Sequence, residues 1–307
     1  MNKPILIIGS SGYIGSALYS KFNKIEYPII GVDIVPSELQ HMQKVMDYDD
    51  LTVQELEGYK SIILLAGNSS VKSCEGEFEP VFNNNVSKFA RLLDKLIQLK
   101  SPPDSVLYAS SASVYGRTIN PTVLSYENSA LSYPINHYDL TKQLIDSISS
   151  VYMNKLKLYG LRFGTVCGFS NNMRWDTIIN SMFKSYKTTN QVIYSSGNDY
   201  RAILSMADLF RATKQLIDEH HTIPSGIYNI HSFNSTIGEI AHEVYYNLYS
   251  LESEIVHNRR PQLLENKCEK TSAYSFRLDG SKLAKHFLIQ DSLKNIIDDL
   301  NDNITFI

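Results

Sequence analysis

The sequence of 307 residues contains only three cysteines, Cys74, Cys167 and Cys268, and they are widely spaced. Such a distribution supports neither a disulfide framework nor a zinc site. The eight histidines show no metal-ligand spacing with cysteines or carboxylates. We therefore expect a protein of a reducing compartment, and we predict no metal cofactor.

The sequence also lacks an excess of basic charge, because 32 Asp and Glu residues outnumber 29 Lys and Arg residues. A net charge of −3 offers no overall positive field for nucleic acid or acidic lipid. No stretch approaches the roughly 18 apolar residues of a membrane helix. The N-terminal run from Ile5 to Ile8 is too short for a signal peptide. We predict a cytoplasmic protein with no nucleic-acid or membrane partner.

Apolar residues make up 43% of the chain and charged residues 20%, which excludes collagen-like, coiled-coil and disordered classes. There is no internal repeat and no low-complexity tract. At roughly 150 residues per domain, the length predicts two lobes or one large domain with an appended second one.

The first half of the chain alternates between short apolar runs and stretches with helical spacing. The expected strands are residues 5–8, 27–32, 61–66, 105–109 and 156–163, and the expected helices are residues 13–22, 81–99 and 138–153. This alternation is typical of a doubly wound parallel α/β sheet of the Rossmann type. We assign this fold to a first domain, residues 1–163.

The pattern becomes less regular after Gly164. The expected helices there are residues 175–186, 207–219, 236–249 and 293–300, the expected strands are residues 191–194 and 226–230, and residues 259–275 are expected to form a loop. We predict a smaller α/β lobe over residues 164–307, from which some segments return to the first domain.

Three glycines, Gly9, Gly12 and Gly15, separate the first expected strand from the first expected helix. A pyrophosphate placed here meets free backbone N–H groups at a helix N-terminus. A glycine triplet alone also fits a plain tight turn. Asp33, 18 residues after Gly15 at the end of the second strand, favours a dinucleotide because its carboxylate suits ribose hydroxyls. The same charge repels a 2′-phosphate, and Ile34 supplies no cation, so NAD is favoured over NADP.

Hydroxyl residues follow the strand that ends at Ala109, at the edge where doubly wound sheets bind ligands. Further along, Tyr138 and Lys142 lie four residues apart and share one face of a helix. An isolated pair of this kind is usually structural. Its position after a glycine loop, an acidic strand end and a serine-rich strand end favours a catalytic site.

These motifs resemble the extended short-chain dehydrogenase/reductase superfamily, specifically its nucleotide-sugar epimerases and dehydratases. The resemblance implies catalytic roles for Ser111, Tyr138 and Lys142. It implies NAD contacts from Gly9, Gly12, Tyr13, Ile14, Gly15, Asp33, Ile34, Asp47, Tyr48, Leu65, Ala66, Gly67, Asn84, Asn85, Ser110, Tyr138 and Lys142. It implies substrate contacts from Ser113, Thr165, Arg174, Arg201 and Arg260. The two last arginines are expected to bind the diphosphate, with surface salt bridges as the alternative.

Lys142 and the nicotinium charge favour the phenolate of Tyr138, which can then take a proton from a sugar hydroxyl while the same carbon gives hydride to NAD. Ser111 can hydrogen-bond the developing carbonyl oxygen. Related dehydratases carry Asp-Glu after this serine, whereas this chain has Ala112 and Ser113. We predict an NAD-dependent nucleotide-sugar 4-epimerase, a homodimer, acting through a transient 4-keto sugar. The alternatives are a 4-keto-sugar reductase, a dehydratase-like enzyme and a dinucleotide-sensing regulatory protein.

Overall fold

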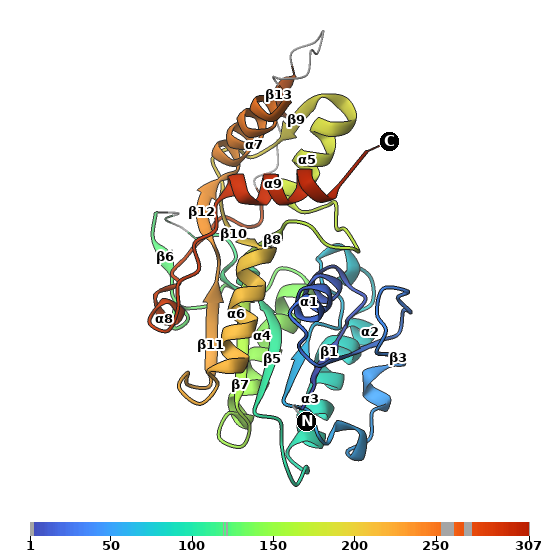
Figure 1. The fold of residues 1–307 in the computed structure, drawn as a ribbon. Coiled ribbons are helices and arrows are strands. Elements are labelled where there is room, and N and C mark those ends of the chain that lie inside the picture. The colour runs from blue at the N-terminus through green and yellow to red at the C-terminus, as the bar shows by residue number, and fades with distance from the viewer. Residues whose placement is uncertain (1–2, 119, 121, 253–260, 267–271, 307) are drawn as a thin grey trace. The chain divides into compact units, whose positions relative to one another are not determined.

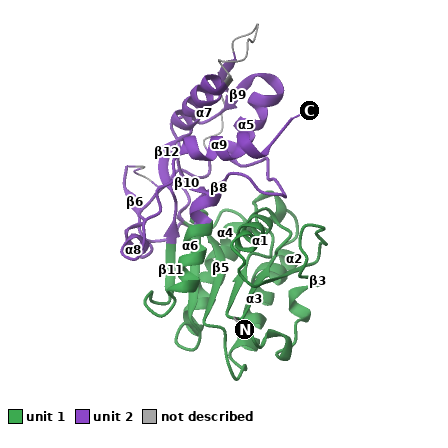
Figure 2. Ribbon diagram, viewed as in Figure 1, with its two compact units in different colours: residues 1–114, 133–162, 210–228 green, residues 115–132, 163–209, 229–307 purple. Residues whose placement is uncertain are grey.

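The computed structural model describes residues 3–118, 120, 122–252, 261–266 and 272–306. Figure 1 shows the order of the elements, and Figure 2 shows two compact units. Unit 1 comprises residues 1–114, 133–162 and 210–228, and unit 2 comprises residues 115–132, 163–209 and 229–307. Each unit is therefore assembled from separate stretches of the chain.

A sheet of seven strands, counted over the described residues, forms the centre of unit 1 in the order β11-β7-β5-β4-β1-β2-β3. The strands are β1 (Ile5–Ile8), β2 (Ile29–Asp33), β3 (Gln43–Val45), β4 (Ser61–Leu64), β5 (Ser105–Ser111), β7 (Leu158–Phe163) and β11 (Gly226–Ile230). β1 pairs in parallel with β2 and with β4, so that Ile8 lies beside Val32 and Leu64. The strand order reverses beside β1, where open sheets of this class bind ligands. The predicted doubly wound parallel fold is confirmed.

The sheet of unit 1 is accompanied by helices and short helical turns. They are α1 (Tyr13–Lys24), η1 (Tyr48–Asp50), η2 (Gln54–Leu56), η3 (Lys72–Cys74), α2 (Phe78–Phe82), η4 (Asn83–Ser87), α3 (Lys88–Leu96), η5 (Ala112–Tyr115), α4 (His137–Tyr152) and α6 (Met206–Asp218). The helical stretch expected over residues 81–99 is present from Phe78 to Leu96, but its middle, η4, is a π-helical stretch that joins α2 to α3. Side-chain hydrogen bonds from Asn85 to neighbouring elements accompany this local change.

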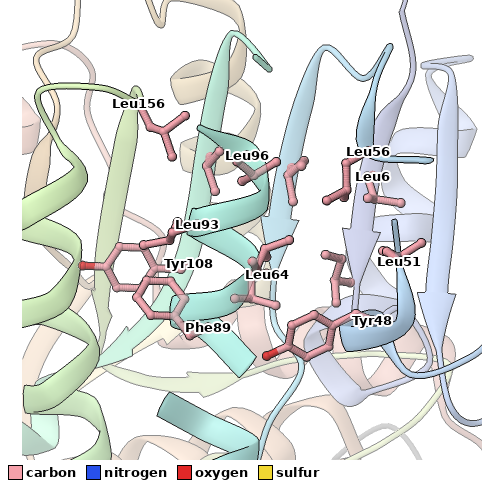
Figure 3. Close-up of a cluster of buried hydrophobic side chains, with 14 of the residues drawn as sticks. Leu6, Tyr48, Leu51, Leu56, Leu64, Phe89, Leu93, Leu96, Tyr108 and Leu156 are labelled. Atoms are coloured by element: carbon pink, nitrogen blue, oxygen red, sulfur yellow. The ribbon is translucent and has the colours of Figure 1, made fainter. Parts of the chain in front are cut away.

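The main core of unit 1 lies between the sheet and α3 with α4 (Figure 3). Leu6 of β1, Leu64 of β4 and Leu93 of α3 all belong to this core, and all three are at most 5% exposed. The rings of Phe89 and Tyr108 have their centroids 5.0 Å apart. Full burial of one such side chain contributes about 1.5–3 kcal/mol. This packing fixes the ends of the strands from which the candidate site is built.

Unit 2 contains three small sheets within its described residues, in the orders β12-β10-β8, β13-β9 and β14-β6. The strands are β6 (Leu124–Ser125), β8 (Thr165–Cys167), β9 (Gln191–Tyr194), β10 (Tyr200–Ser205), β12 (Phe233–Thr236), β13 (Gln262–Glu265) and β14 (Arg277–Leu278). The helices are α5 (Ile178–Thr189), α7 (Ile237–Glu252), α8 (Ser281–Ala284) and α9 (Leu293–Asn303). Phe183, Ile240 and Ile297 are among the residues that form its core.

Two local expectations in unit 2 are wrong. The polar segment expected to be a loop contains β13, which pairs in parallel with β9 and places Leu263 against the core. The helix expected from Trp175 begins only at Ile178, and Trp175 lies in the preceding turn. Among the described residues, no helix has the length and apolarity needed to cross a membrane.

Candidate active site

The glycine loop between β1 and α1 is packed too closely for side chains at two of its three glycines. A Cβ on Gly9, whose φ is +86°, would lie 2.5 Å from Ala66 N, and a Cβ on Gly15 would lie 2.0 Å from Gly9 O. These glycines therefore allow the loop to fold against the end of β4. A Cβ on Gly12 would meet only Gly9 O, at 3.4 Å, so this position serves something other than internal packing.

The first turn of α1 has donors available for a ligand. Gly12 is the N-cap residue and provides no side-chain hydrogen bond, and Tyr13 is the first helical residue. The N–H groups of Ile14 and Gly15 have no hydrogen-bond acceptor within the described part of the chain. Unsatisfied N–H groups and the helix dipole together favour an anion such as a pyrophosphate.

Asp33 lies at the end of β2, where its carboxylate is held against the glycine loop. Oδ2 accepts a hydrogen bond from Ser11 N at 2.9 Å, and Oδ1 accepts one from Val35 N at 3.0 Å. Gln43 Nε2 supports the same loop by donating to Ser11 Oγ at 2.8 Å. Ile34, the next expected cofactor contact, is 69% exposed. The structure thus brings together the glycine loop and the carboxylate that are expected to bind a dinucleotide.

Asp47 and Tyr48, two of the expected NAD contacts, lie in different environments. Burial acts to raise the pKa of Asp47, but hydrogen bonds from Lys88 and from Asp49 N outweigh it and hold the pKa below its usual value. Tyr48 is 5% exposed and its ring belongs to the hydrophobic core (Figure 3). Only the main chain of Tyr48 is therefore suited to a cofactor contact.

The turn after β4 is held by the π-helical stretch. Leu65 N and Ala66 N both donate to Ile8 O, at 2.8 and 3.1 Å. A Cβ on Gly67 would lie 2.7 Å from Asn85 Oδ1. Sequence reasoning missed Asn68, which directly follows this Leu-Ala-Gly run.

Asn68 connects the two expected asparagines. Its N–H donates to Asn85 Oδ1 at 2.7 Å, and its carbonyl accepts from Asn85 Nδ2 at 3.1 Å. Asn84 Nδ2 donates to Asn68 Oδ1 at 2.7 Å, and Asn85 Nδ2 also reaches Thr141 Oγ1 of α4 at 3.2 Å. The asparagines thus fix the β4 turn to α4, and π-helical stretches of this kind are frequent at functional sites.

The serines at the end of β5 form a local hydroxyl cluster. Ser111 Oγ donates to Ser113 Oγ at 3.0 Å and accepts from Ser113 N at 3.1 Å. Ser110 is 2% exposed, and its Oγ has no hydrogen-bond partner among the described residues. Ala112 is 1% exposed and carries no polar group. Hydroxyls, without a carboxylic acid, therefore line this strand end.

Tyr138 and Lys142 lie on one face of α4, as the spacing predicted. Lys142 Nζ lies 5.7 Å from the centroid of the Tyr138 ring and donates to Ala109 O at 2.7 Å. Asn136 caps the helix by accepting a hydrogen bond from Asp139 N at 2.9 Å. The Lys142 contact fixes the Tyr138 helix to the strand end that carries Ser111.

Burial lowers the pKa of Lys142 to about 8, and Asp146 acts in the opposite direction, as does the thiolate form of Cys74. A pKa near 8 leaves most of the lysine protonated at neutral pH. An ammonium this close to a phenol stabilises the phenolate. The arrangement can therefore remove a proton from a hydroxyl placed between Tyr138 and Ser111.

Unit 2 contains the expected substrate residues Thr165, Arg174 and Arg201. Thr165 begins β8 and pairs with Ile203 of β10. Arg174 Nε forms an ion pair with Asp176 Oδ1 at 2.6 Å. Arg260 lies outside the described residues.

Arg201 has an unusual set of partners. Its Nη1 donates to the carbonyls of Tyr200 and Tyr274, and its Nη2 donates to Ser272 Oγ at 2.6 Å. It has no carboxylate partner among the described residues, so the alternative of a surface salt bridge is not observed. Within the described ranges, no group of three or more His, Cys, Asp or Glu side chains is arranged to hold a metal.

Comparison with known proteins relates this arrangement to a family. Residues 5–230 match the NAD dependent epimerase/dehydratase family. Protein CapI of Staphylococcus aureus is 26% identical over 238 residues, which cover 69% of each chain. A UDP-glucuronic acid 4-epimerase from Bacillus cereus, solved with UDP-glucuronic acid and NAD, is 20% identical, with a TM-score of 0.78 over 97% of this chain and 98% of the other. DesIV of Streptomyces venezuelae, a dTDP-glucose 4,6-dehydratase, is 19% identical, with a TM-score of 0.78 over 98% and 97%.

Proposed function

The chain belongs to the NAD-dependent epimerase/dehydratase family, and on that basis we propose that it is an NAD-dependent nucleotide-sugar 4-epimerase. The observation that carries the proposal is which residues lie at the C-terminal end of β5. Lys142, which lies beside the Tyr138 ring, donates to Ala109 O of the strand that carries Ser111, and no acid directly follows the serine. This set can oxidise and reduce a carbinol carbon, but it has no group suited to expelling water.

The residues of the glycine loop and Asp33 fit NAD. The glycine loop leaves helix N–H groups for the pyrophosphate, and Asp33 is oriented to accept hydrogen bonds from ribose hydroxyls. Ile34 and Val35 carry no positive charge that could pair with a 2′-phosphate, so NADP is disfavoured. Bound NAD would supply the hydride acceptor, and then the hydride donor, at carbon 4 of the sugar. Because the same hydride returns, no external reductant is consumed.

Three side chains carry the proton chemistry. Tyr138 takes the proton of the sugar 4-hydroxyl and later returns a proton to the 4-keto oxygen. The Lys142 ammonium stabilises the phenolate between these steps. Ser111 Oγ donates a hydrogen bond to the oxygen at carbon 4 as carbonyl character develops. Rotation of the keto sugar between the two half-reactions exposes its other face and inverts the centre.

Ala112 and Ser113 argue against the dehydratase alternative. Elimination of water from carbon 6 requires an acid and a base beside the sugar. Ala112 has no ionisable group, and the Ser113 hydroxyl does not titrate near neutral pH. The reductase alternative would consume NADPH, which Asp33 disfavours.

For the substrate we propose a nucleotide-diphosphate sugar. Arg201 and Arg260 are the proposed diphosphate ligands, and Ser113, Thr165 and Arg174 are the proposed sugar contacts. The paired hydroxyls of Ser111 and Ser113 suit a polar sugar such as a hexuronate, and the Bacillus cereus relative acts on UDP-glucuronic acid. We also propose that the enzyme is a cytoplasmic homodimer that serves carbohydrate biosynthesis.

The decisive test is incubation with NAD and a panel of nucleotide sugars, followed by NMR of the products. We expect inversion at carbon 4, retention of deuterium placed at carbon 4, and no net NADH. A 4-keto-6-deoxy or pentose product would contradict the epimerase, stoichiometric cofactor oxidation would favour the reductase, and NAD binding without turnover of any sugar would favour a dinucleotide sensor.

A further inference from the structure

Asp146 lies one helical turn after Lys142 on the same face of α4. Four residues of α-helix rise by about 6 Å, so the two charges are near neighbours along the helix axis. Asp146 is 3% exposed and belongs to none of the motifs described above. A buried carboxylate behind a candidate catalytic lysine requires an explanation.

Two side chains of the central sheet hold this carboxylate. Arg162 Nε of β7 donates to Asp146 Oδ2 at 2.9 Å, and both side chains are at most 4% exposed. The Tyr108 hydroxyl of β5 donates to Asp146 Oδ1 at 3.2 Å, and Ser149 Oγ lies 2.7 Å from the same hydroxyl. All of these residues belong to unit 1, so the carboxylate is fixed between α4 and two neighbouring strands.

Stability alone is a weak reason for such a pair. The desolvation of two buried charges often cancels their attraction, and apolar residues of similar volume can stabilise a protein equally well. Within the pair, however, the Asp146 carboxylate provides a negative charge at a fixed position one helical turn after Lys142. Lys142 Nζ donates its hydrogen bond to a neutral carbonyl, that of Ala109, so a nearby carboxylate favours the ammonium form of the lysine.

We propose that Asp146 is a positioning residue that acts through Lys142, its fixed carboxylate balancing the lysine ammonium charge beside the Tyr138 ring. The catalytic consequence rests on the proposed epimerase function. The electrostatic coupling between Asp146 and Lys142 does not depend on that function, because it exists without substrate.

The other groups around Lys142 do not replace this charge. Asp146 and Cys74 are the groups whose charges act on Lys142, and Tyr138 and Asp139 of α4, Tyr108 of β5 and Arg162 of β7 also belong to this region. Burial raises the pKa of the Cys74 thiol and of the Tyr108 phenol, so both are neutral near pH 7. Asp139 is engaged at the helix N-terminus by Asn136 Nδ2 at 2.9 Å. Asp146 is therefore the carboxylate that opposes the effect of burial on Lys142.

The first experiment measures Lys142 directly, without substrate. Protein labelled with ¹³C at the lysine Cε is titrated by NMR, and the Lys142 signal is assigned by its loss in Lys142→Met. In Asp146→Asn we expect the Lys142 titration midpoint to fall by about one pH unit or more, the usual effect of a nearby opposite charge. Asp146→Glu should retain most of the wild-type midpoint. An unchanged midpoint in Asp146→Asn overturns the proposal.

The second experiment follows the reaction. In Asp146→Asn the alkaline limb of the pH profile of kcat should shift to lower pH, by the same number of pH units as the NMR midpoint of Lys142. The KM for the sugar nucleotide should change less than twofold. Asp94→Asn is the matched control, because Asp94 is a carboxylate of α3 that accepts from Tyr152 of α4 at the surface. Asp94→Asn should shift neither the NMR midpoint of Lys142 nor the alkaline limb of the kcat profile. Equal shifts in both variants would overturn a specific role for Asp146.

In Asp146→Asn the buried Arg162 guanidinium loses its carboxylate partner, and an unpaired buried charge can unfold the protein. The double variant Asp146→Asn/Arg162→Met removes both charges and restores neutrality, and its Lys142 midpoint should still lie below that of the wild type. A wild-type midpoint in the folded double variant overturns the proposal. If the wild-type enzyme epimerises no sugar, the proposed function fails, while the NMR titration still decides the coupling.

Discussion

Gly15→Ala tests the glycine loop at its tightest point. The added Cβ would lie 2.0 Å from Gly9 O and 2.8 Å from Ser10 Cα. Both are main-chain atoms, which cannot rotate away as a side chain can, so the loop must move from the end of β1. Overpacking of this kind costs about 1–3 kcal/mol, and each kcal/mol lowers Tm by about 2–4 °C for a unit of this size. We expect a Tm roughly 2–12 °C below wild type without any ligand.

Gly12→Ala is the matched control for Gly15→Ala. Its φ of −67° suits alanine, and the nearest atom to the new Cβ is Gly9 O at 3.4 Å. Its Tm should therefore lie within about 2 °C of wild type, which is the size of change that a surface substitution usually causes. NAD affinity should still fall at least tenfold, because the methyl group meets the incoming pyrophosphate at the α1 N-terminus. Calorimetric unfolding and NAD titration measure both effects. A wild-type Tm for Gly15→Ala, or an equal loss in Gly12→Ala, would refute the packing argument.

Four further outcomes follow from the site. The protein should bind NAD at least tenfold more tightly than NADP, and Asp33→Ser should narrow that gap in fluorescence titrations; equal wild-type affinities would contradict the role of Asp33. Tyr138→Phe should lower kcat by at least about 10² with unchanged circular dichroism, and a near-normal rate would place the base elsewhere. Arg201→Ala should raise KM for the sugar nucleotide more than it lowers kcat, and an unchanged KM would relocate the diphosphate. Because Lys142 has a pKa of about 8 and acts as the ammonium, kcat should fall as pH rises through 8; a rise would reverse its assigned protonation state.

The sequence predicted the elements whose signal is local. The apolar run of residues 5–8 is β1, and the Tyr138–Lys142 spacing does place both side chains on one face of α4. The glycine loop was also recognisable, because main-chain packing there demands residues without a Cβ. These features depend on a few adjacent residues, so reading them requires no knowledge of the tertiary structure.

The remaining features depend on contacts between distant residues. β13 is polar and short, and it becomes a strand only through its pairing with β9. The π-helical stretch carries Asn85, whose side chain reaches Asn68 and Thr141, and neither partner is identifiable from helical spacing. Asp146 and Arg162 are likewise 16 residues apart in the sequence, and their pair joins a helix to a strand. Propensity and periodicity carry no information about such partners.

The discontinuous units have a consequence for biosynthesis. The chain passes between the two units five times, and the last stretch of unit 1, which contributes to β11, ends at residue 228. During synthesis from the N-terminus, unit 1 cannot complete its sheet until three quarters of the chain has left the ribosome. The edge of β7 therefore stays open during translation, and an unpaired edge of this kind is a site of misassembly. Neither unit can be expressed by cutting the gene once, so an isolated cofactor-binding unit would require joining distant segments or permuting the chain.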